Sequence, residues 1–303
     1  MDEPSSAGAE IVVVGSVNLD LVVRVETLPH AGETVLATGY HEFVGGKGGN
    51  QAVAAARLGR RVAFVGHVGT DQAASTVRSA LADEGVDVTL LTPVDGPTGR
   101  AFVQVDDEAE NQIIVVGGAN GALSEADVAA AAPLLTGSPV VVAQLEVPLE
   151  AVVAAGRRTS GVFVLNPAPA QELPRELLAL VDVLVVNEGE FEVVTGAPVS
   201  EEALTSSSLP ERVVVTLGGR GALVRDGASV LSVGAPRVEV VDTTGAGDTF
   251  VGALAAALAR DVPYADAVRW AVGAASLSTQ ALGATSGMPS AAEVDRLMST
   301  SGS

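Results

Sequence analysis

Short valine-rich runs alternate along this chain with longer stretches rich in alanine and leucine that repeat with helical periodicity. Runs this short and this apolar are typical of strands that are buried on both faces of a sheet. Because helical stretches separate them, the pattern predicts an α/β domain with a buried, mostly parallel sheet. The expected strands lie near residues 11–15, 62–65, 140–145, 162–166, 183–187 and 213–217, and the expected helices near residues 50–58, 72–84, 124–135, 149–158 and 247–260.

Two segments break this alternation, residues 20–44 and 97–117, because they contain extended stretches and no helical pattern. We expect them to form a small antiparallel sheet beside the main one. The extended stretches are residues 34–38, 100–105 and 111–116. No linker or internal repeat interrupts the rest of the chain, so residues 11–303 are expected to form one domain after a short flexible leader, residues 1–10.

Composition excludes several classes of protein. A net charge of −20 disfavours binding to a nucleic-acid backbone. There is no cysteine, which excludes disulfides and thiolate metal sites, and His30, His41 and His67 are too scattered to suggest a metal cluster. No apolar run reaches the roughly 20 residues that a membrane helix needs, and the acidic start lacks the basic region of a signal peptide. We therefore expect a cytoplasmic enzyme that binds neither nucleic acid nor membranes.

Residues 241–250 read Val-Asp-Thr-Thr-Gly-Ala-Gly-Asp-Thr-Phe, which places a carboxylate directly behind a run of small residues. A strand-like run at 238–241 precedes this stretch and a helical pattern follows, so residues 245–247 are expected at a helix N-terminus. Free amide groups there favour an anion such as a transferring phosphoryl group. Asp248, in the first turn, suits a general base that removes a hydroxyl proton. The alternative is an acidic residue that only favours the helix start.

A second glycine cluster, residues 45–50, also opens a helical run, which ends at Gly59. Its order does not fit a Walker A loop, and no dinucleotide-binding GxGxxG pattern follows the first strand. Lys47, within this cluster, is the only lysine in the chain, although 17 residues are basic. A compact cation between glycines can reach a ligand. The alternative is a lysine in a solvated loop.

Polar side chains stand where three of the expected strands end. Asn18 and Asp20 follow the first strand, Glu146 follows the run at 140–145, and Asn187 ends the run at 183–187. Each of them alone is typical of a cap or a turn. Because open α/β sheets bind ligands at the carboxyl ends of their strands, their shared edge favours a binding site.

A series of motifs in this order resembles the ribokinase-like, or PfkB, family of carbohydrate kinases, from about residue 11 to about residue 297. Both glycine clusters match the signature regions of that family. The other matching stretches are Gly15-Ser16-Val17-Asn18-Leu19-Asp20, Pro29-His30-Ala31-Gly32-Glu33-Thr34, Gly118-Ala119-Asn120, Gln144-Leu145-Glu146, Asn166-Pro167-Ala168-Pro169-Ala170, Asn187-Glu188-Gly189-Glu190 and Thr216-Leu217-Gly218.

The resemblance implies a ribokinase-like fold, a three-layer α/β/α core with a mostly parallel sheet and a small antiparallel β lid over the sugar site. It also implies a homodimer in which two lids pair. The activity implied is ATP-dependent phosphorylation of D-ribose at O5, which gives D-ribose 5-phosphate and ADP. In this reaction Asp248 would be the general base, and the amides of Gly245, Ala246 and Gly247 would form the anion hole.

Site residues also follow from the resemblance. The implied sugar contacts are Asn18, Asp20, Gly46, Lys47, Gly48, Gly49, Asn50, Glu146 and Asp248. The implied ATP contacts are Asn187, Thr216, Leu217, Gly218, Gly219, Arg220, Gly221, Gly247 and Val272, with Glu190 organising the hydration shell of Mg²⁺. The implied K⁺ site uses Asp242 and Thr244, completed by backbone around Ser278, Ala281, Gly283 and Gly287.

The chain departs from the family pattern at two positions. Relatives often have a glycine where this chain has Ala74, which we expect to affect a helix start, and a polar residue near Val272, close to the adenine. Two other functions stay open. A kinase for another pentose or for a nucleoside is one, although nine aromatic residues offer little surface for a base. A sugar-binding regulator without activity is the other, although it would be expected to lose the base or the anion hole.

Overall fold

The fold is described from a computed structural model that covers residues 8–108, 110–206 and 208–301. The leader predicted at residues 1–10 lies mostly outside these ranges. Glu10 is part of the folded domain, because its backbone N–H donates to the Arg61 carbonyl (2.9 Å) and its carboxylate pairs with Arg60 (3.1 Å).

The main sheet has nine strands, in the spatial order β13-β12-β11-β10-β9-β8-β1-β4-β5. The seven strands from β11 to β5 in this order are parallel to one another, and β12 and β13 form an antiparallel edge. Their bounds are β1 Ile11–Val14, β4 Val62–Val68, β5 Asp87–Pro93, β8 Val140–Ala143, β9 Val162–Leu165, β10 Val183–Asn187, β11 Arg212–Thr216, β12 Ala222–Asp226 and β13 Ser229–Val233.

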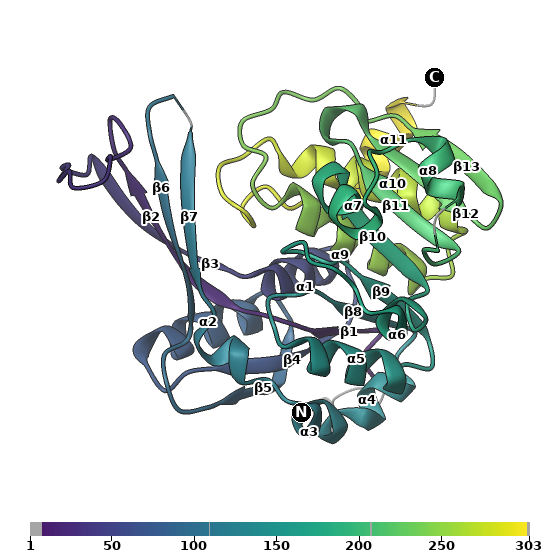
Figure 1. The fold of residues 1–303 in the computed structure, drawn as a ribbon, viewed down its shortest axis with the longest axis horizontal. Coiled ribbons are helices and arrows are strands. Elements are labelled where there is room, and N and C mark those ends of the chain that lie inside the picture. The colour runs from purple at the N-terminus through teal and green to yellow at the C-terminus, as the bar shows by residue number, and fades with distance from the viewer. Residues whose placement is uncertain (1–7, 109, 207, 302–303) are drawn as a thin grey trace.

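Helices cover both faces of this sheet (Figure 1). One apolar core contains side chains of α1 (Lys47–Arg57), α2 (Gln72–Asp83), α9 (Ala246–Leu258), α10 (Tyr264–Ser278) and α11 (Ala291–Ser301). The other contains side chains of α3 (Glu125–Ala130), α4 (Ala132–Gly137), α5 (Leu149–Arg158), α6 (Arg175–Leu178), α7 (Glu188–Thr195) and α8 (Glu201–Ser206). Among the described residues, no helix combines the length and the apolar character needed to cross a membrane.

The strand β1 explains why the sheet needs two helical layers. Successive side chains of a strand point to opposite faces. Ile11 and Val13 accordingly belong to one core, and Val12 and Val14 to the other, and none of the four is more than 1% exposed. The continuous valine run is therefore a strand buried on both faces, and the predicted three-layer α/β/α core is confirmed.

A second sheet projects from the edge of the core as a lid (Figure 1). Its strand order is β3-β2-β6-β7, with bounds β2 Asn18–Arg24, β3 Gly39–Gly45, β6 Gly99–Val105 and β7 Asn111–Val116. The pairs β2–β3 and β6–β7 are antiparallel, as predicted, whereas β2 and β6 run parallel. The lid is thus built from the two segments that lacked helical patterns.

Three expected elements differ in the structure. The strand predicted at 34–38 lies instead at Gly39–Gly45, because β2 pairs with residues 39–45 in antiparallel register. The strand-like run at 238–241 does not join a sheet. The helix predicted over 124–135 is divided into two helices at Ala131. A proline lies within the first two positions of α4, and because it has no N–H it cannot donate a hydrogen bond to the preceding turn.

Candidate active site

The helix α9 begins at the glycine-rich turn that the sequence singled out. Gly245 is its N-cap residue, with a left-handed φ of 75°, and an ideal Cβ at this position would overlap the carbonyl oxygen of Ala284. Only glycine fits such a turn without strain. At Gly247 an added Cβ would meet nothing within 4 Å, so this side of the turn is open. The Ala246 N–H donates to the Thr243 carbonyl (3.2 Å), so the open position for an anion at this helix start is at Gly247.

Asp248, in the first turn of α9, is held by two amide side chains of α1. Its Oδ2 accepts from Asn50 Nδ2 (2.9 Å) and its Oδ1 from Gln51 Nε2 (3.0 Å). Gln51 is itself fixed, because Nε2 also donates to Asn166 Oδ1 (3.1 Å) and Oε1 accepts from Gln144 Nε2 (2.6 Å). This chain of buried amides orients the carboxylate.

Burial raises the pKa of Asp248, although the charge of Lys47 and the bonds from Asn50 and Gln51 act in the opposite direction. Glu146 adds to the rise, because a second carboxylate nearby disfavours ionisation. A carboxylate with a raised pKa is a stronger base than one in water. The surroundings of Asp248 therefore suit proton abstraction.

The second glycine cluster forms the N-terminus of α1 and lies directly against the end of β1. Gly46 is the N-cap residue with a φ of 84°, and an ideal Cβ there would lie 2.8 Å from the Val17 Cα. An ideal Cβ at Gly48 would lie 2.7 Å from the Ser16 backbone nitrogen. This close approach of two backbones requires glycine and places Asn50 beside Asp248.

Glu146 ties the start of α1 to the carboxyl end of β8. Its Oε2 accepts from the Lys47 backbone N–H (3.0 Å) and from Ser16 Oγ (2.5 Å). The predicted sugar residues Gly46–Gly49, Lys47, Asn50 and Glu146 thus come together at one edge of the sheet. Because the side chain of Lys47 lines the cavity described below, it faces a site, in contrast to the solvated-loop alternative.

Asn18 and Asp20, the predicted diol contacts, lie at the start of β2. Asn18 is 3% exposed, and its Oδ1 accepts from Asn120 Nδ2 (2.8 Å). Asp20 Oδ1 and Asn50 Oδ1 are buried and have no hydrogen-bond donor within the described part of the chain. Buried polar atoms are normally paired, so these two acceptors indicate a ligand that brings hydroxyl donors.

The pKa of Asp20 is raised to about 7, chiefly by burial and further by the charges of Glu146 and Asp248. Burial also raises the pKa of Glu190, and Asp248 adds to that rise, whereas Lys47 opposes it. Several carboxylates thus share the neighbourhood of the one lysine in the chain. A ligand that donates hydrogen bonds or carries a cation would relieve this repulsion.

A cavity of about 160 Å³ lies between the carboxyl ends of β10 and β11 and the N-terminus of α9. Asn187 and Glu190 stand at its rim and form a reciprocal capping box at the start of α7, with bonds of 2.8 to 2.9 Å. The lining residues are Lys47, Asn166, Ala168, Val185, Val186, Asn187, Glu190, Thr216, Gly245, Gly247, Asp248 and Val251. Predicted sugar, nucleotide and catalytic residues therefore meet at one cavity.

Not every predicted nucleotide residue lines this cavity. The residues Leu217, Gly218, Gly219, Arg220 and Gly221 form the turn after β11, around the short 3₁₀ helix η2 (Gly218–Arg220). Arg220 is exposed and pairs with Glu188 (2.6 Å). Val272 lies within α10 and is 5% exposed, so its side chain is part of the apolar core. A role for Val272 at the adenine thus requires contact through its exposed edge or backbone.

Asp242 and Thr244 form a compact turn ahead of α9. Asp242 Oδ1 accepts from the backbone N–H and the hydroxyl of Thr244 (2.9 and 2.7 Å), and Oδ2 accepts from the Gly283 N–H (2.8 Å). Burial would raise the pKa of Asp242, but these bonds lower it below its ordinary value. The remaining predicted cation-site residues, Ser278, Ala281, Gly283 and Gly287, lie at the end of α10 and in the loop after it.

The residues predicted for the cation site offer oxygen atoms only. Asp242 is the one carboxylate among them, and an ideal Cβ at Gly287 would overlap the Ser278 carbonyl oxygen. Carboxylate and carbonyl oxygens are ligands for hard cations. No group of three or more His, Asp or Glu side chains among the described residues is arranged for a metal.

Four residues of the site were not predicted to have roles. Gln51, Gln144 and Asn166 form the amide chain behind Asp248, and Ser16 holds Glu146. Ser16, Gln144 and Asn166 lie within motifs that carry the family resemblance, Gln51 directly follows the second glycine cluster, and three of the four are buried amides. A buried amide needs hydrogen-bond partners, so these three amides, each beside apolar residues in the sequence, could have been recognised as residues that support the site.

The model of the pfkB family of carbohydrate kinases matches residues 9–291 of the chain. This protein belongs to that family. Among its relatives is the Haemophilus influenzae ribokinase, which is 41% identical over 93% of this chain and 96% of its own length. The Bacillus subtilis ribokinase is 38% identical over 95% of this chain and 99% of its own.

Solved structures of the same family agree with the fold. An Arabidopsis thaliana ribokinase complexed with ribose and ATP has a TM-score of 0.89 and 33% identity, over 96% of this chain and 99% of its own. The Thermotoga maritima ribokinase has a TM-score of 0.88 and 34% identity over the same shares. A nucleoside kinase from Methanocaldococcus jannaschii shares the fold at 18% identity.

The raised pKa of Asp20 predicts a pH-dependent cost to stability. The folded-state pKa of Asp20 is about 7, above the ordinary value of 3.8, so between these two pH values the folded protein keeps a proton that the unfolded chain loses. The free energy of unfolding therefore falls as the pH rises from 4 to 7. Asp20→Asn removes this titration. We expect its free energy of unfolding, relative to wild type, to rise by about 1 kcal/mol or more between pH 5 and pH 8.

Urea unfolding at several pH values measures this difference. The matched control is Asp266→Asn, which makes the same change of side chain at an exposed carboxylate in the first turn of α10, outside the site. A difference between Asp20→Asn and wild type that stays constant from pH 5 to pH 8 would show that Asp20 titrates normally.

Proposed function

We propose that the protein is an ATP-dependent kinase that phosphorylates D-ribose at O5 and releases D-ribose 5-phosphate and ADP. The observation that carries this proposal is the position of Asp248. Its half-buried carboxylate accepts from Asn50 (2.9 Å), whose own Oδ1 is an unpaired acceptor, and it lines the cavity together with Asn187 and Thr216. The family and the ribokinases to which the chain is similar support the same substrates.

The proposed chemistry is an in-line phosphoryl transfer. Asp248 accepts the proton of the 5-hydroxyl while O5 forms a bond to the γ-phosphorus, and the bond to the β,γ-bridging oxygen breaks, so that ADP leaves. The helix start at residues 245–247 would stabilise the charge of the transferring group, with the amide of Gly247 on its open side, whereas the Ala246 N–H would first have to leave the Thr243 carbonyl. Lys47 supplies a positive charge in the same cavity.

Recognition of the sugar depends on directed hydrogen bonds. We propose that Asp20 accepts from two adjacent ribose hydroxyls and that Asn18, Asn50 and Glu146 complete the set, together with the backbone of Gly46–Gly49. Asp20 and Asn50 have free acceptors that a hydroxyl would satisfy. A sugar that lacks one of these hydroxyls leaves a buried group unpaired and is rejected.

On the nucleotide side, we propose that Asn187, Thr216 and the turn Leu217–Gly221 hold ATP, with Gly247 at the γ-phosphate. Mg²⁺ would come with ATP as part of the substrate, and it usually keeps several waters. Glu190 would accept hydrogen bonds from those waters, because it lies at the cavity beside Lys47 and Asp248.

A substrate panel tests the assignment. D-ribose should give the highest kcat/KM with ATP when it is compared with other pentoses, hexoses and nucleosides in a coupled assay, and the product should carry phosphate on O5. Replacement of ribose by 5-deoxyribose should abolish transfer. A higher kcat/KM for a nucleoside or a hexose would make this protein a different kinase of the same family.

The base role predicts the behaviour of Asp248→Asn. The variant should fold and bind ribose but lose at least about 10²-fold in kcat, because the amide cannot take up the proton. Turnover and calorimetric binding of ribose measure the two effects separately. Asp266→Asn, also in the first turn of a helix, should keep normal turnover. Near-normal kcat in Asp248→Asn would remove Asp248 from the base role.

We further propose that K⁺ binds at Asp242 and Thr244 and orders the turn that presents the amides of α9. A bound cation would neutralise Asp242 and hold the loop at Gly283 against Gly245, where Ala284 already packs. Activity in K⁺ buffer should therefore exceed activity in Na⁺ buffer at equal ionic strength, and Asp242→Asn should remove the difference. Equal kcat/KM of the wild type in both buffers would contradict this site.

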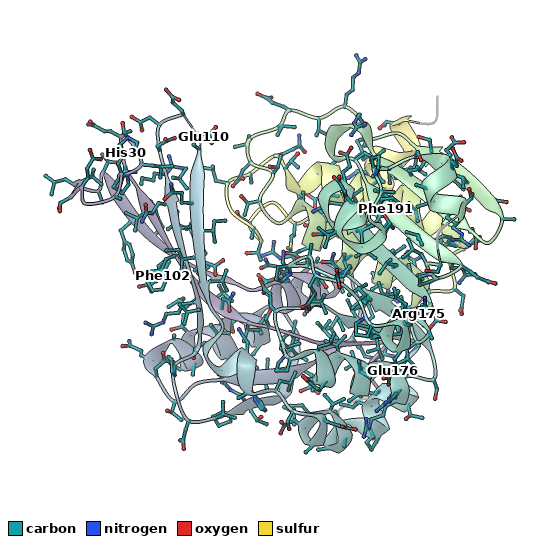
Figure 2. All side chains as sticks on the ribbon, in the orientation of Figure 1. His30, Phe102, Glu110, Arg175, Glu176 and Phe191 are labelled. Carbon is teal, nitrogen blue, oxygen red and sulfur yellow. The ribbon has the colours of Figure 1, made fainter. Side chains whose placement is uncertain are left out.

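The outer face of the lid supports a homodimer. Phe102 and Ile114 are paired across β6 and β7 and are 41% and 63% exposed, and Phe102 also pairs with Leu21 of β2, which packs partly against the core. Figure 2 shows Phe102 on the side of the lid that points away from the core. An apolar face on a sheet with exposed edges is typical of an interface. We propose that a second copy of the chain covers it.

Substitution on that face tests the dimer. Ile114→Lys should convert a dimer to a monomer in sedimentation velocity, because it buries a charge in an apolar contact. Val193→Lys, at an exposed valine on α7 away from the lid, should leave the association unchanged. A monomeric wild-type protein at micromolar concentration would contradict the proposal.

A further inference from the structure

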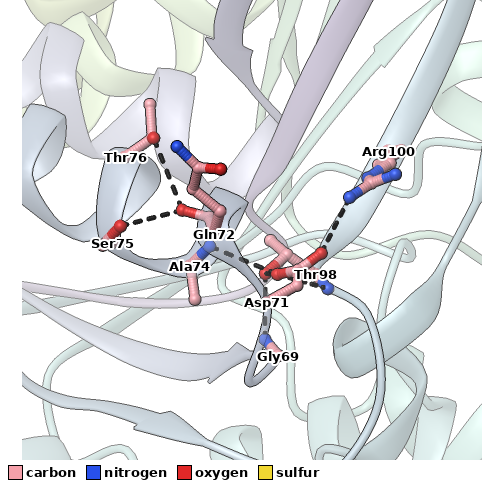
Figure 3. Close-up of polar contacts among 8 residues, drawn as sticks. All are labelled: Gly69, Asp71, Gln72, Ala74, Ser75, Thr76, Thr98 and Arg100. Carbon is pink, nitrogen blue, oxygen red and sulfur yellow. Dashed lines mark hydrogen bonds and ion pairs between the residues drawn. The ribbon is translucent and has the colours of Figure 1, made fainter.

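A polar cluster lies where the lid strand β6 leaves the core, and none of its members lines the cavity (Figure 3). Its centre is Asp71, the N-cap residue of α2. Thr98 and Arg100 come from the other side of the joint, at the start of β6. Thr98 is completely buried, and its hydroxyl also accepts from the Gly69 N–H (3.0 Å).

Asp71 does more than cap its helix. Its Oδ1 accepts from the Ala74 N–H (3.3 Å), which is the capping bond, and also from the N–H (3.3 Å) and hydroxyl (2.6 Å) of Thr98. Its Oδ2 accepts from Arg100 Nη2 (2.8 Å). Burial would raise the pKa of Asp71, but the bonds from Thr98 and Ala74 and the charge of Arg100 lower it. The carboxylate therefore joins core to lid as an ion.

The segment that Asp71 holds is the surface on which Asn18 rests. An ideal Cβ at Gly99, between Thr98 and Arg100, would overlap both Asn18 Oδ1 and Asn120 Nδ2. The parallel register pairs Asn18 with Gly99 and Leu19 with Arg100. A shift of the β6 backbone at Gly99 would therefore displace the Asn18 side chain.

We propose that Asp71 and Arg100 are positioning residues for sugar recognition, because they lock the start of β6 and so fix the side chain of Asn18 toward the ribose hydroxyls. Neither residue touches the substrate. This inference rests on the proposed function, since it concerns the sugar that Asn18 binds. The bonds from Thr98 fix the position of the backbone just before β6. The ion pair with Arg100 fixes the direction in which β6 leaves the core.

A purely structural role for Asp71 makes a different prediction. Asn and Ser are as good as Asp at an N-cap position, so a residue needed only for the helix would tolerate both. Asp71→Asn can keep the bonds of Oδ1 but loses the charge that pairs with Arg100. Asp71→Ser can cap α2, but its side chain is too short to reach Thr98 and Arg100 together.

Steady-state kinetics of Asp71→Asn, Asp71→Ser and Arg100→Gln test the proposal. We expect KM for ribose to rise about threefold to tenfold in Asp71→Asn and Arg100→Gln, and further in Asp71→Ser, while KM for ATP stays within about twofold. Because the two charges act as a pair, the double variant Asp71→Asn/Arg100→Gln should be no worse than the more affected single variant. Calorimetric titration with ribose should show the same order.

The control is Ser200→Ala, which removes the side-chain cap of α8, a helix beside β12 at the opposite end of the main sheet from the lid. It should lower the melting temperature as much as Asp71→Ser does and leave KM for ribose unchanged. Unchanged ribose KM in both Asp71→Ser and Arg100→Gln, or a ribose KM that follows melting temperature across all variants, would overturn the inference. Wild-type protein that does not bind ribose would instead overturn the proposed function, so the two failures are distinguishable.

Discussion

The close approach of α1 and α9 is the constraint on which the site depends. An ideal Cβ at Gly252 in α9 would lie 2.6 Å from both the Gln51 carbonyl oxygen and the Ala54 Cβ of α1, so the helices touch backbone to backbone. At this distance Asn50 and Gln51 reach the carboxylate of Asp248 directly. Both helices begin at a glycine with positive φ, and both beginnings face the same cavity. One packing contact thus aligns the proposed base, the anion hole and the sugar loop.

The carboxylates gathered at the site destabilise the folded protein when no ligand is bound. Burial raises the pKa values of Asp20 and Asp248, the charge of Glu146 raises both further, and Lys47 opposes the rise at Asp248. Such a cluster costs stability, which is the usual compromise where catalytic groups are gathered. Ribose hydroxyls would satisfy the free acceptors, and the cationic part of the nucleotide complex would offset the charge. Bound substrates would therefore stabilise the site more than water does.

Local signals explain which features were predictable. The glycine turns and Asp248 carry their geometry in sequence, because positive φ and free amides at a helix start are properties of a few adjacent residues. The buried strands followed from valine runs. The amide chain from Gln144 to Gln51 to Asp248 was not predicted, since it joins side chains about a hundred residues or more apart. The strand at Gly39–Gly45 was misplaced to 34–38, because pairing with β2, and not apolar composition, sets its position.

The most direct test of the account is a crystal structure of the protein with D-ribose and a non-hydrolysable ATP analogue. The account predicts that the ribose O5 lies within about 3 Å of an Asp248 carboxylate oxygen, the distance that proton transfer requires. It also predicts that the γ-phosphate contacts the amides at residues 245–247 and that the sugar hydroxyls satisfy Asp20 Oδ1. A complex in which O5 is bound by another side chain, or in which Asp248 faces a different hydroxyl, would contradict the central claim.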